Sequence, residues 1–504
     1  MSLAKFPSAT VDGISASPTT VEVDVASGLP AFSVIGLTDR LVDESRERVR
    51  SAIKNSGYKF PLNRITVHLA PSEVKKSGAH FDVPIALSVL LADKQIPSST
   101  RLKDCLIIGG LSLDGGIQPV RAVLVLAQWA KKKGLKQLLV PRDNAAEAAL
   151  VEGIAVLPIS TLREVVDWLS GVIEIEPYRR TLEGPLADRD EVWSQIRGQE
   201  QAKRAALVAA AGGHSILLHG PPGAGKTMLA KALQALLPPL EQDEQIEVLQ
   251  IHSVFGILAP EEILSFRRRP LRSPHHSASH IAMVGGGNSA IRPGEISLAH
   301  RGILFLDELP EFPRQVIESL RQPIEDKIVH VARANARTSF PADFQMVATM
   351  NPCPCGWFES GLKECGCSAH QIEQYRKRVS GPILDRIDMS IQMVPVSLEQ
   401  LQTTSQGDNT ELAAKQAAVK EVWRRSKERS GGLNAALSPK NVNALINLEP
   451  EAQALLEQAS RQQVITGRGF HKLLRVAQTI ADLDGRATVS AGNLAEALQY
   501  RFQR

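Results

Sequence analysis

The chain has 504 residues, too many for one hydrophobic core, so we expect between two and four domains. Its composition is that of an ordinary globular protein, and a formal net charge of +4 is too small to indicate a nucleic-acid partner by itself. The longest nearly uncharged apolar run, residues 83–92, is too short to span a membrane, and the N-terminus lacks a secretory signal. We therefore predict a cytoplasmic location and no membrane partner. Five cysteines, four of them clustered, argue against a secreted disulfide framework and for metal binding or catalysis in a reducing compartment.

The order of predicted elements divides the chain into three parts. Residues 1–170 alternate strand-like and helix-like segments, which predicts an α/β domain. Residues 171–190 lose this periodicity and mix Pro, Gly and charge, as linkers do. A second α/β domain is expected at residues 191–395, and residues 396–504 open with a polar loop and then become helical. The predicted fold class is α/β with a helical C-terminal domain.

The segment GPPGAGKT follows an apolar strand and precedes a helix, which is the context of a phosphate-binding loop. Its glycines allow backbone N–H groups to face phosphates at a helix N-terminus. We expect Lys226 to contact the β- and γ-phosphates and Thr227 to offer its hydroxyl to Mg²⁺. A glycine loop with a purely structural role is the alternative. The predicted cofactors are ATP and Mg²⁺, and the nucleotide-binding residues are Gly220, Pro221, Pro222, Gly223, Ala224, Gly225, Lys226 and Thr227.

Two further apolar strands are expected to end in polar side chains. GILFLDEL places Asp307 and Glu308 after one strand, and FQMVATMN places Asn351 after another. Because the carboxyl ends of parallel strands meet at one edge of a sheet, these groups should face the phosphate loop. We expect Asp307 to hold Mg²⁺ through water, Glu308 to polarise the attacking water and Asn351 to orient it. The alternatives are solvated strand ends and, for Asn351, a turn before Pro352.

These three strand-end features, in this order, resemble the Walker A, Walker B and sensor 1 motifs of the AAA+ ATPases. The resemblance implies an arginine that reaches the nucleotide of a neighbouring subunit. SGPILDRID supplies Arg386 for this role, Arg376 and Arg378 are rivals just upstream, and a surface Asp–Arg pair is the alternative. Arg468 resembles sensor 2, because a cation in the first turn of a helix needs an anion opposite it.

Two arginine-rich segments distinguish this chain from a minimal AAA+ core. The interval between Lys226 and Asp307 is too long for one helix, strand and helix, so we expect an insert at about residues 260–298. Residues 327–340 predict strand, turn and strand. In a ring, both segments would line the pore and track a phosphate backbone, whereas solvated arginines or intersubunit ion pairs are the alternative. The candidate DNA-binding residues are Arg267, Arg268, Arg269, Arg272, Arg292, Arg333 and Arg337.

Several longer strings narrow the resemblance to one family. RSPHHSASHIAMVGGG, RPGEISLAHRGILFLDELPEF, MNPCPCG and SGPILDRID occur in this order, and FSVIGL and VKKSGAHFDVPIAL precede them. Over essentially its whole length the chain resembles the ComM/YifB family of magnesium-chelatase-like AAA+ proteins. The resemblance implies a homo-hexameric ATPase and helicase that binds single-stranded and branched DNA. It also implies branch migration during homologous recombination in natural transformation, with recombination proteins as partners.

The resemblance further implies that residues 1–170 form a Lon-protease-like domain. Lon-like enzymes use a Ser–Lys dyad, but the turn KSGAHFD places His80 at the serine position, and LDGGIQPVRAV places Val120 near the lysine position. Without a hydroxyl or an amine, nucleophilic catalysis by this route is lost. We therefore expect a non-proteolytic domain that organises the oligomer, with His80 as a cryptic catalyst the lesser alternative.

A cluster of thiols directly follows Asn351, as two Cys-x-Cys pairs. Four thiolates on two short turns can close around Zn²⁺, although the spacing differs from that of Cys-x₂-Cys knuckles, and free buried thiols are the alternative. We interpret the segment as a structural zinc loop that contacts DNA or the adjacent subunit. The candidate Zn²⁺ ligands are Cys353, Cys355, Cys365 and Cys367.

Two other function classes stay open. A chelatase motor acting on a tetrapyrrole is one, although the Lon-like domain and the cysteine cluster argue against it. The other is a protein-remodelling ATPase. Motors that thread proteins usually grip with aromatic side chains, and neither proposed pore loop contains Tyr or Trp, although Phe266 and Phe340 lie at their bases.

Overall fold

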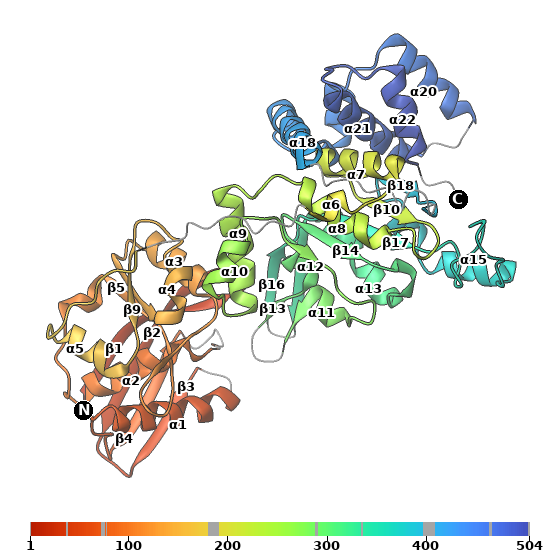
Figure 1. Ribbon diagram of the computed structural model, residues 1–504. Helices are drawn as coiled ribbons and strands as arrows, with labels where there is room; N and C mark the ends of the chain where they lie inside the picture. Colours follow the sequence, from red (N-terminus) through yellow and green to blue (C-terminus); the bar gives the residue numbers. More distant parts are fainter. Residues whose placement is uncertain are drawn as a thin grey trace.

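The computed structural model describes residues 2–36, 39–71, 76, 78–179, 191–287, 291–333, 336–396, 409–462 and 466–501. Figure 1 shows an N-terminal α/β region, a central α/β region and a helical C-terminal region that follow one another along the chain. The predicted α/β class is confirmed. Within the described residues, no helix is both long enough and apolar enough to cross a bilayer.

The N-terminal region contains a four-stranded sheet in the order β1-β2-β4-β3, a parallel three-stranded sheet in the order β5-β8-β9, and the ribbon β6-β7. The pairs β1-β2 and β2-β4 are antiparallel, and β3-β4 is parallel. The strands are β1 (Ser2–Asp12), β2 (Ser15–Ala26), β3 (Ala31–Ile35), β4 (Arg64–Ala70), β5 (Cys105–Ile107), β6 (Gly110–Leu111), β7 (Ile117–Gln118), β8 (Gln137–Pro141) and β9 (Ala155–Ile159). The α-helices are α1 (Asp39–Asn55), α2 (Asp82–Ala92), α3 (Val123–Lys132), α4 (Ala145–Ala148) and α5 (Leu162–Leu169).

The sequence of strand β2 shows why one face of the four-stranded sheet is buried. Val21, Val23 and Val25 alternate with polar residues, so one face of the strand is buried and the other is partly exposed. The buried face packs against α2, which is mostly apolar and buried at every residue except Leu91. The one carboxylate in α2, Asp82, is compensated by an ion pair with Arg48 at 2.7 Å.

The two residues at the expected dyad positions lie inside the N-terminal domain. His80 is 4% exposed, and its Nε2 lies 3.1 Å from the carbonyl oxygen of Ala9. Burial lowers the pKa of His80 to about 4, so the ring is neutral at physiological pH. Val120 is also buried, and its backbone N–H donates to Asn144. A substrate cannot reach either residue in this arrangement.

The central region is organised around a five-stranded parallel sheet in the order β11-β14-β17-β10-β18. Helices cover its faces. The strands of the region are β10 (Ile216–His219), β11 (Leu271–Arg272), β12 (Gly285–Gly286), β13 (Arg292–Pro293), β14 (Ile303–Leu306), β15 (Ile328–Arg333), β16 (Ala336–Pro341), β17 (Gln345–Met350) and β18 (Met389–Gln392). Its helices are α6 (Glu191–Ser194), α7 (Glu200–Gly212), α8 (Lys226–Leu236), α9 (Gln242–Phe255), α10 (Pro260–Ser265), α11 (His280–Val284), α12 (Glu295–Leu298), α13 (Arg314–Ser319), α14 (Arg321–Asp326), α15 (Ala369–Lys377) and α16 (Gly381–Leu384).

The segment expected as one insert is divided by a strand of the sheet. Leu271 and Arg272 form β11, which pairs with β14 at the sheet edge. The extra residues therefore lie in two places: α9 and α10 before β11, and α11 with the ribbon β12-β13 after it. A two-residue strand carries too little alternation to be recognised in the sequence. The second arginine-rich segment forms the predicted hairpin, with β15 and β16 antiparallel.

The C-terminal region is a helical bundle, as expected. Its helices are α18 (Asn409–Ser430), α19 (Pro439–Leu445), α20 (Pro450–Gln462), α21 (Gly467–Leu483) and α22 (Ala491–Gln499). Apolar residues of these helices share one core with α7 and α8 of the central region. Trp423 of α18 also donates its indole N–H to the carbonyl of Ala210 in α7 at 2.9 Å. The bundle is therefore firmly joined to the central region.

Helix α9 joins the N-terminal domain to the central region, and the two lie side by side in Figure 1. The hydroxyl of Ser253 in α9 donates to the buried carboxyl group of Glu147. The backbone carbonyl of Ser253 accepts a hydrogen bond from the N–H of Ala122 at 2.8 Å. A second contact lies at the β15-β16 hairpin, where Thr338 donates to Asp12 at 2.6 Å. The turn between β1 and β2 thus touches the hairpin that we expected to contact DNA.

Glu147 is expected to make this domain contact depend on pH. Burial raises the pKa of its carboxyl group to about 7, so the folded protein favours the neutral acid. The resulting stabilisation is complete below the unfolded pKa near 4.5 and is lost as the pH rises through about 7. We predict that Glu147→Gln flattens the fall in melting temperature between about pH 5 and pH 8 in scanning calorimetry. Glu174→Gln, at an exposed ion pair with Arg101, is the control, and equal pH slopes in both variants would contradict the prediction.

Candidate functional site

The predicted nucleotide residues meet at the carboxyl edge of the central sheet. In the register of the sheet, the last residue of β10 is opposite the last residue of β17, and the last residue of β14 is opposite Ala348. Each strand therefore delivers the next residues of the chain to the same edge. The loop after β10 leads directly into α8, whose first residue is Lys226.

Lys226 is the centre of this edge. Its amine donates to the carbonyl oxygens of Gly220 and Pro221 at 2.7 and 2.9 Å, and to Oδ1 of Asn351 at 2.9 Å. Only 9% of the residue is exposed. Burial lowers the pKa of the amine, while the carboxylates of Asp307 and Glu308 act in the opposite direction. The charge is held in place by groups from two strands, ready to pair with an anion.

The hydroxyl of Thr227 and the carboxylate of Asp307 connect the first turn of α8 to the end of β14. Thr227 Oγ1 donates to Asp307 Oδ2 at 3.1 Å, and Thr349 Oγ1 donates to Asp307 Oδ1 at 2.6 Å. Hydroxyl and carboxylate oxygens are the hard ligands that Mg²⁺ prefers. The donor set at this position therefore fits a magnesium ion held beside the phosphate loop.

Glu308 stands in a strained position beside Asp307. Its φ of 55° lies in the left-handed region, which costs on the order of 1–3 kcal/mol for a residue with a side chain. Its backbone N–H donates to Thr349 Oγ1 at 2.8 Å. His276, which follows β11, places Nδ1 3.7 Å from Glu308 Oε2. The carboxylate is exposed, with the imidazole of His276 beside it.

Thr349 and His276 are site residues that our sequence analysis missed. Thr349 had a detectable signal, because residues two apart on a strand share a face and Asn351 follows it by two. No such signal marks His276, which comes close to Glu308 only because β11 and β14 pair.

The candidate arginines Arg386 and Arg468 are not among the residues that contact Lys226. Arg386 Nη2 lies 2.7 Å from Glu325 Oε1, and Arg468 lies 3.5 Å from the same oxygen. Two guanidinium groups therefore meet at one carboxylate. The rivals are differently placed: Arg378 pairs with Glu311 at 2.9 Å, and Arg376 lies over the ring of Phe358 at 5.5 Å.

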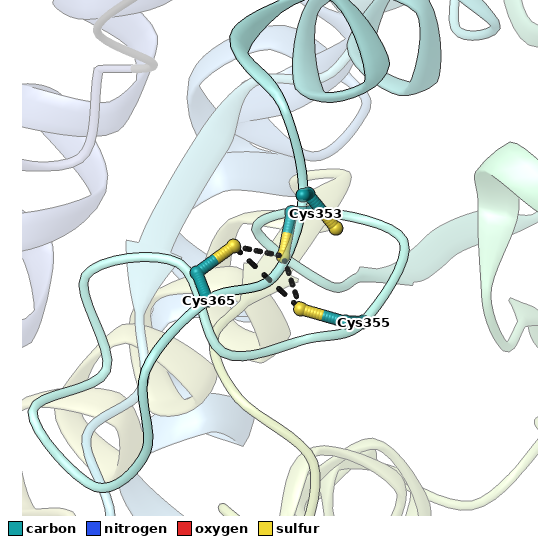
Figure 2. A group of neighbouring side chains, drawn as sticks. Cys353, Cys355 and Cys365 are labelled. Atoms are coloured by element: carbon teal, nitrogen blue, oxygen red, sulfur yellow. Dashed lines mark hydrogen bonds between the residues drawn. The ribbon is translucent and has the colours of Figure 1, made fainter.

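The four cysteines behind Asn351 form one cluster. Their sulfur atoms all lie within 4.8 Å of one another, and Figure 2 shows three of them directed toward a common centre. Cys353 Sγ lies 3.3 Å from that of Cys355 and 3.6 Å from that of Cys365. Tetrahedral Zn–S bonds place sulfurs about 3.8 Å apart, which these spacings approach. The backbone N–H of Trp357 lowers the pKa of Cys355 to about 6, whereas the pKa values of Cys365 and Cys367 are raised by desolvation and by hydrogen bonds within the cluster.

The arginines predicted to bind DNA divide into two groups. Arg269 is 5% exposed, pairs with Glu244 at 2.6 Å and stacks on Trp423, so it belongs to the core. Arg272 forms a two-pronged ion pair with Glu295. These arginines are engaged inside the chain, and we leave both out of the DNA-contacting surface.

The remaining arginines of that group are differently situated. Arg267 and Arg292 are exposed and Arg268 is half-buried. Arg333 and Arg337 lie next to the turn of the β15-β16 hairpin, and their side chains lie outside the described residues.

Three known protein families match the N-terminal, central and C-terminal regions of the chain. The family described as magnesium chelatase, subunit ChlI, matches residues 192–401. Two related families, described as subunit ChlI of Mg-chelatase and subunit ChlI C-terminal, match residues 21–144 and 410–501.

Individual relatives cover nearly the full length. Competence protein ComM of Haemophilus influenzae is 40% identical over 99% of this chain and 98% of its own. The uncharacterized protein YifB of Escherichia coli is 39% identical over 99% of this chain and 97% of its own. The magnesium-chelatase 38 kDa subunit of Rhodobacter capsulatus is 28% identical over only 32% of this chain and 50% of its own. The chain therefore belongs to the ComM/YifB family of magnesium-chelatase-like AAA+ ATPases.

Proposed function

We propose that this ATPase is a ring-forming DNA motor, a homo-hexamer that drives branch migration in the cytoplasm when incoming DNA is recombined during natural transformation. The ATPase part rests chiefly on one observation, the contact of Lys226 and Thr227 with Asn351 and Asp307 across three strand ends. The DNA part is supported by the name of the competence relative and by the arginines on the two inserted features. Recombination proteins are the partners that this role would require.

The binding chemistry follows from the contacts at the sheet edge. Bound ATP supplies the phosphoryl group that water attacks, and Mg²⁺ neutralises the charge that develops on it. Lys226 would exchange its carbonyl partners for the β- and γ-phosphates, which are stronger acceptors. Thr227 and Asp307 would hold the metal, with Thr349 fixing the carboxylate. The backbone N–H groups from Gly220 to Gly225 would bind the phosphates at the N-terminus of α8.

Hydrolysis would depend on Glu308, which polarises the attacking water, and on Asn351, which orients it. Arg386 would serve the nucleotide of the adjacent subunit, with Arg468 beside it as sensor 2. Their shared partner Glu325 is partly exposed, so an incoming phosphate can compete for the guanidinium groups. This division of the site between subunits makes turnover depend on ring assembly.

A polyanion fits the inserted features better than an unfolded protein does. Arg292 is exposed on the β12-β13 ribbon. The pKa of Arg121 in the N-terminal domain is lowered, mainly because Arg121 is partly desolvated and secondly because the charge of Arg292 repels its own. Positive charge from two domains thus gathers at this surface. The aromatic residues at the loop bases cannot grip a chain, because Phe340 is fully buried and Phe266 stacks on His252.

The N-terminal domain would organise the ring rather than cut peptides. Buried His80 and Val120 leave the Lon-like dyad without a nucleophile or an accessible base. The domain instead contacts α9 and the β15-β16 hairpin.

We also propose that the four clustered cysteines bind Zn²⁺. The thiols come from two short turns, and their sulfur spacings approach those of a tetrahedral site. A metal would hold together a segment that is otherwise exposed and poor in apolar contacts.

The function is tested by a three-strand branch-migration assay with purified protein and ATP. Stimulation of ATP turnover by single-stranded DNA, an unfolded protein and a porphyrin would be compared in parallel. We expect stimulation by DNA alone, and weaker stimulation at higher salt, because phosphate contacts release counterions. Stimulation by porphyrin would favour a chelatase motor, and stimulation by unfolded protein a remodelling ATPase.

Lys226→Ala and Glu308→Gln should separate nucleotide binding from hydrolysis. Lys226→Ala removes the charge that pairs with the phosphates, so ATP binding and turnover should both be lost. Glu308→Gln keeps the shape but not the base, so ATP binding and assembly should persist while turnover falls by about 100-fold or more. Binding of a fluorescent ATP analogue and steady-state turnover measure these effects. Turnover above a tenth of wild type in Glu308→Gln would exclude the assigned role.

Arg333→Ala with Arg337→Ala should weaken the grip on single-stranded DNA. Each lost phosphate contact lowers the slope of log affinity against log salt by about 0.7, so the double variant should lose about 1.4. Fluorescence anisotropy over a salt series measures the slope. The matched control is Arg424→Ala with Arg425→Ala, two α18 arginines paired with Glu421. Equal slopes in both double variants would contradict a DNA contact at the hairpin.

Cys365→Ser should release the metal. Wild-type protein is expected to hold about one zinc per chain by elemental analysis, and the variant close to none, because three thiolates bind zinc more weakly than four. Cys105→Ser, in a buried thiol of the N-terminal domain, is the control and should keep the metal. Equal zinc in wild type and Cys365→Ser would argue for free thiols.

A further inference from the structure

The segment that carries the cysteines, residues 352–368, is here called the cysteine loop. We propose that zinc in this loop braces the Walker A turn, so that metal occupancy sets the affinity for nucleotide. The inference rests on the proposed nucleotide and zinc sites. It gives the cysteine loop a role inside its own subunit, in place of the contact with DNA or a neighbour that its sequence position had indicated.

The brace is a close contact between Gly356 and Pro222. A Cβ atom on Gly356 would lie 2.7 Å from Cδ and 3.2 Å from Cγ of Pro222, nearer than side chains approach one another. Gly356 also has a φ of +83°, which favours glycine. Pro222 is the third residue of the Walker A segment, whose backbone would bind the phosphates. The cysteine loop therefore lies directly against the nucleotide-binding turn.

The same glycine is tied to the thiol cluster. Its N–H donates to the carbonyl of Cys353 at 3.0 Å, and it follows Cys355 directly in the chain. Cys353 is fully buried, and its sulfur accepts from the N–H of Phe358 at 3.4 Å, as metal-bound thiolates commonly do. A metal that fixes Cys353 and Cys355 would thus fix the turn that ends at Gly356, and Gly356 is the residue that meets Pro222.

The other side of the loop is held by the strands of the nucleotide site. Cys353 comes two residues after Asn351, whose amide oxygen accepts from Lys226. Arg376 of α15 covers the ring of Phe358. The pKa of His219 is lowered to about 4, mainly because its ring is buried and secondly because the charges of Arg376 and Lys226 repel a proton on it. The cysteine loop therefore contacts Pro222 of the Walker A segment through Gly356 and α15 through Phe358.

These contacts predict what loss of the metal does. Without zinc, Cys355 and Cys365 lie at the surface with only weak sulfur contacts to hold them, so Gly356 is free to move away from Pro222. The Walker A turn then has to be ordered when nucleotide binds, which lowers the affinity. Loss of zinc would therefore lower nucleotide affinity by shifting the backbone, while every residue proposed to bind the nucleotide is still present.

Gly356→Ala tests the contact without touching a metal ligand. The added methyl group must push Pro222 away, so we expect about one zinc per chain but roughly tenfold weaker binding of a fluorescent ATP analogue. Gly361→Ala is the matched control. Gly361 lies in the same loop with a φ of +69°, but its Cβ would meet nothing within 4 Å. It carries the same backbone strain without the contact, and should bind metal and nucleotide nearly as wild type does.

Cys365→Ser provides a second arm that does not depend on how Gly356→Ala folds. The full-length variant should bind the ATP analogue about tenfold more weakly, as Gly356→Ala does, and wild type stripped by a chelator should recover its affinity when Zn²⁺ alone is restored. Circular dichroism confirms that each variant is folded.

The possible failures can be told apart. If wild type does not bind the analogue, the proposed nucleotide site fails. If wild type binds it but holds no zinc, or if Gly356→Ala and zinc-free Cys365→Ser bind it as tightly as Gly361→Ala does, the brace is overturned while the ATPase proposal stands. The brace is likewise overturned if zinc loss weakens DNA binding and leaves nucleotide affinity unchanged.

Discussion

Lys226 places a charged amine where little water can reach it, and the arrangement of the nucleotide edge follows from that constraint. A buried ammonium must be surrounded by acceptors, and its own loop supplies two carbonyl oxygens. The third acceptor, Asn351, comes from a strand that follows far later in the chain. Only a parallel sheet with β10 and β17 adjacent brings these groups together, so strand order is a condition of the chemistry.

The insertions connect this edge to the rest of the molecule. Helix α9 holds the N-terminal domain through Ser253 and Glu147, and its opposite side holds the sheet through the ion pair of Glu244 with Arg269. Because Arg269 lies two residues before β11, a shift of α9 would displace the strand at the sheet edge. The contact of Asp12 with the β15-β16 hairpin adds a second connection. The N-terminal domain is therefore placed to influence the edge of the central sheet and the β15-β16 hairpin, although it has no accessible catalytic dyad.

Sequence was a reliable guide wherever chemistry is local. Asp307 and Asn351 could be placed at one sheet edge because each directly follows a recognisable apolar strand, and Lys226 because the glycine loop that carries it follows another. The arginines were different. Whether Arg269 and Arg272 face DNA depends on where Glu244 and Glu295 lie, and these acids are brought to them by tertiary packing. Gly356 illustrates the same limit, since nothing local indicates that it meets Pro222.

The meeting of Arg386 and Arg468 at Glu325 bears on why the site should need a second subunit. One carboxylate neutralises one guanidinium, so the group keeps a surplus positive charge at a partly exposed position. The Arg386 side chain is only 13% exposed and also donates to the carbonyl of Pro382, whereas its partner Glu325 is 46% exposed, so a phosphate would approach the guanidinium from the carboxylate side. Arg378, paired separately with Glu311, lacks this shared carboxylate, and the charge balance therefore favours Arg386 for the role across the interface.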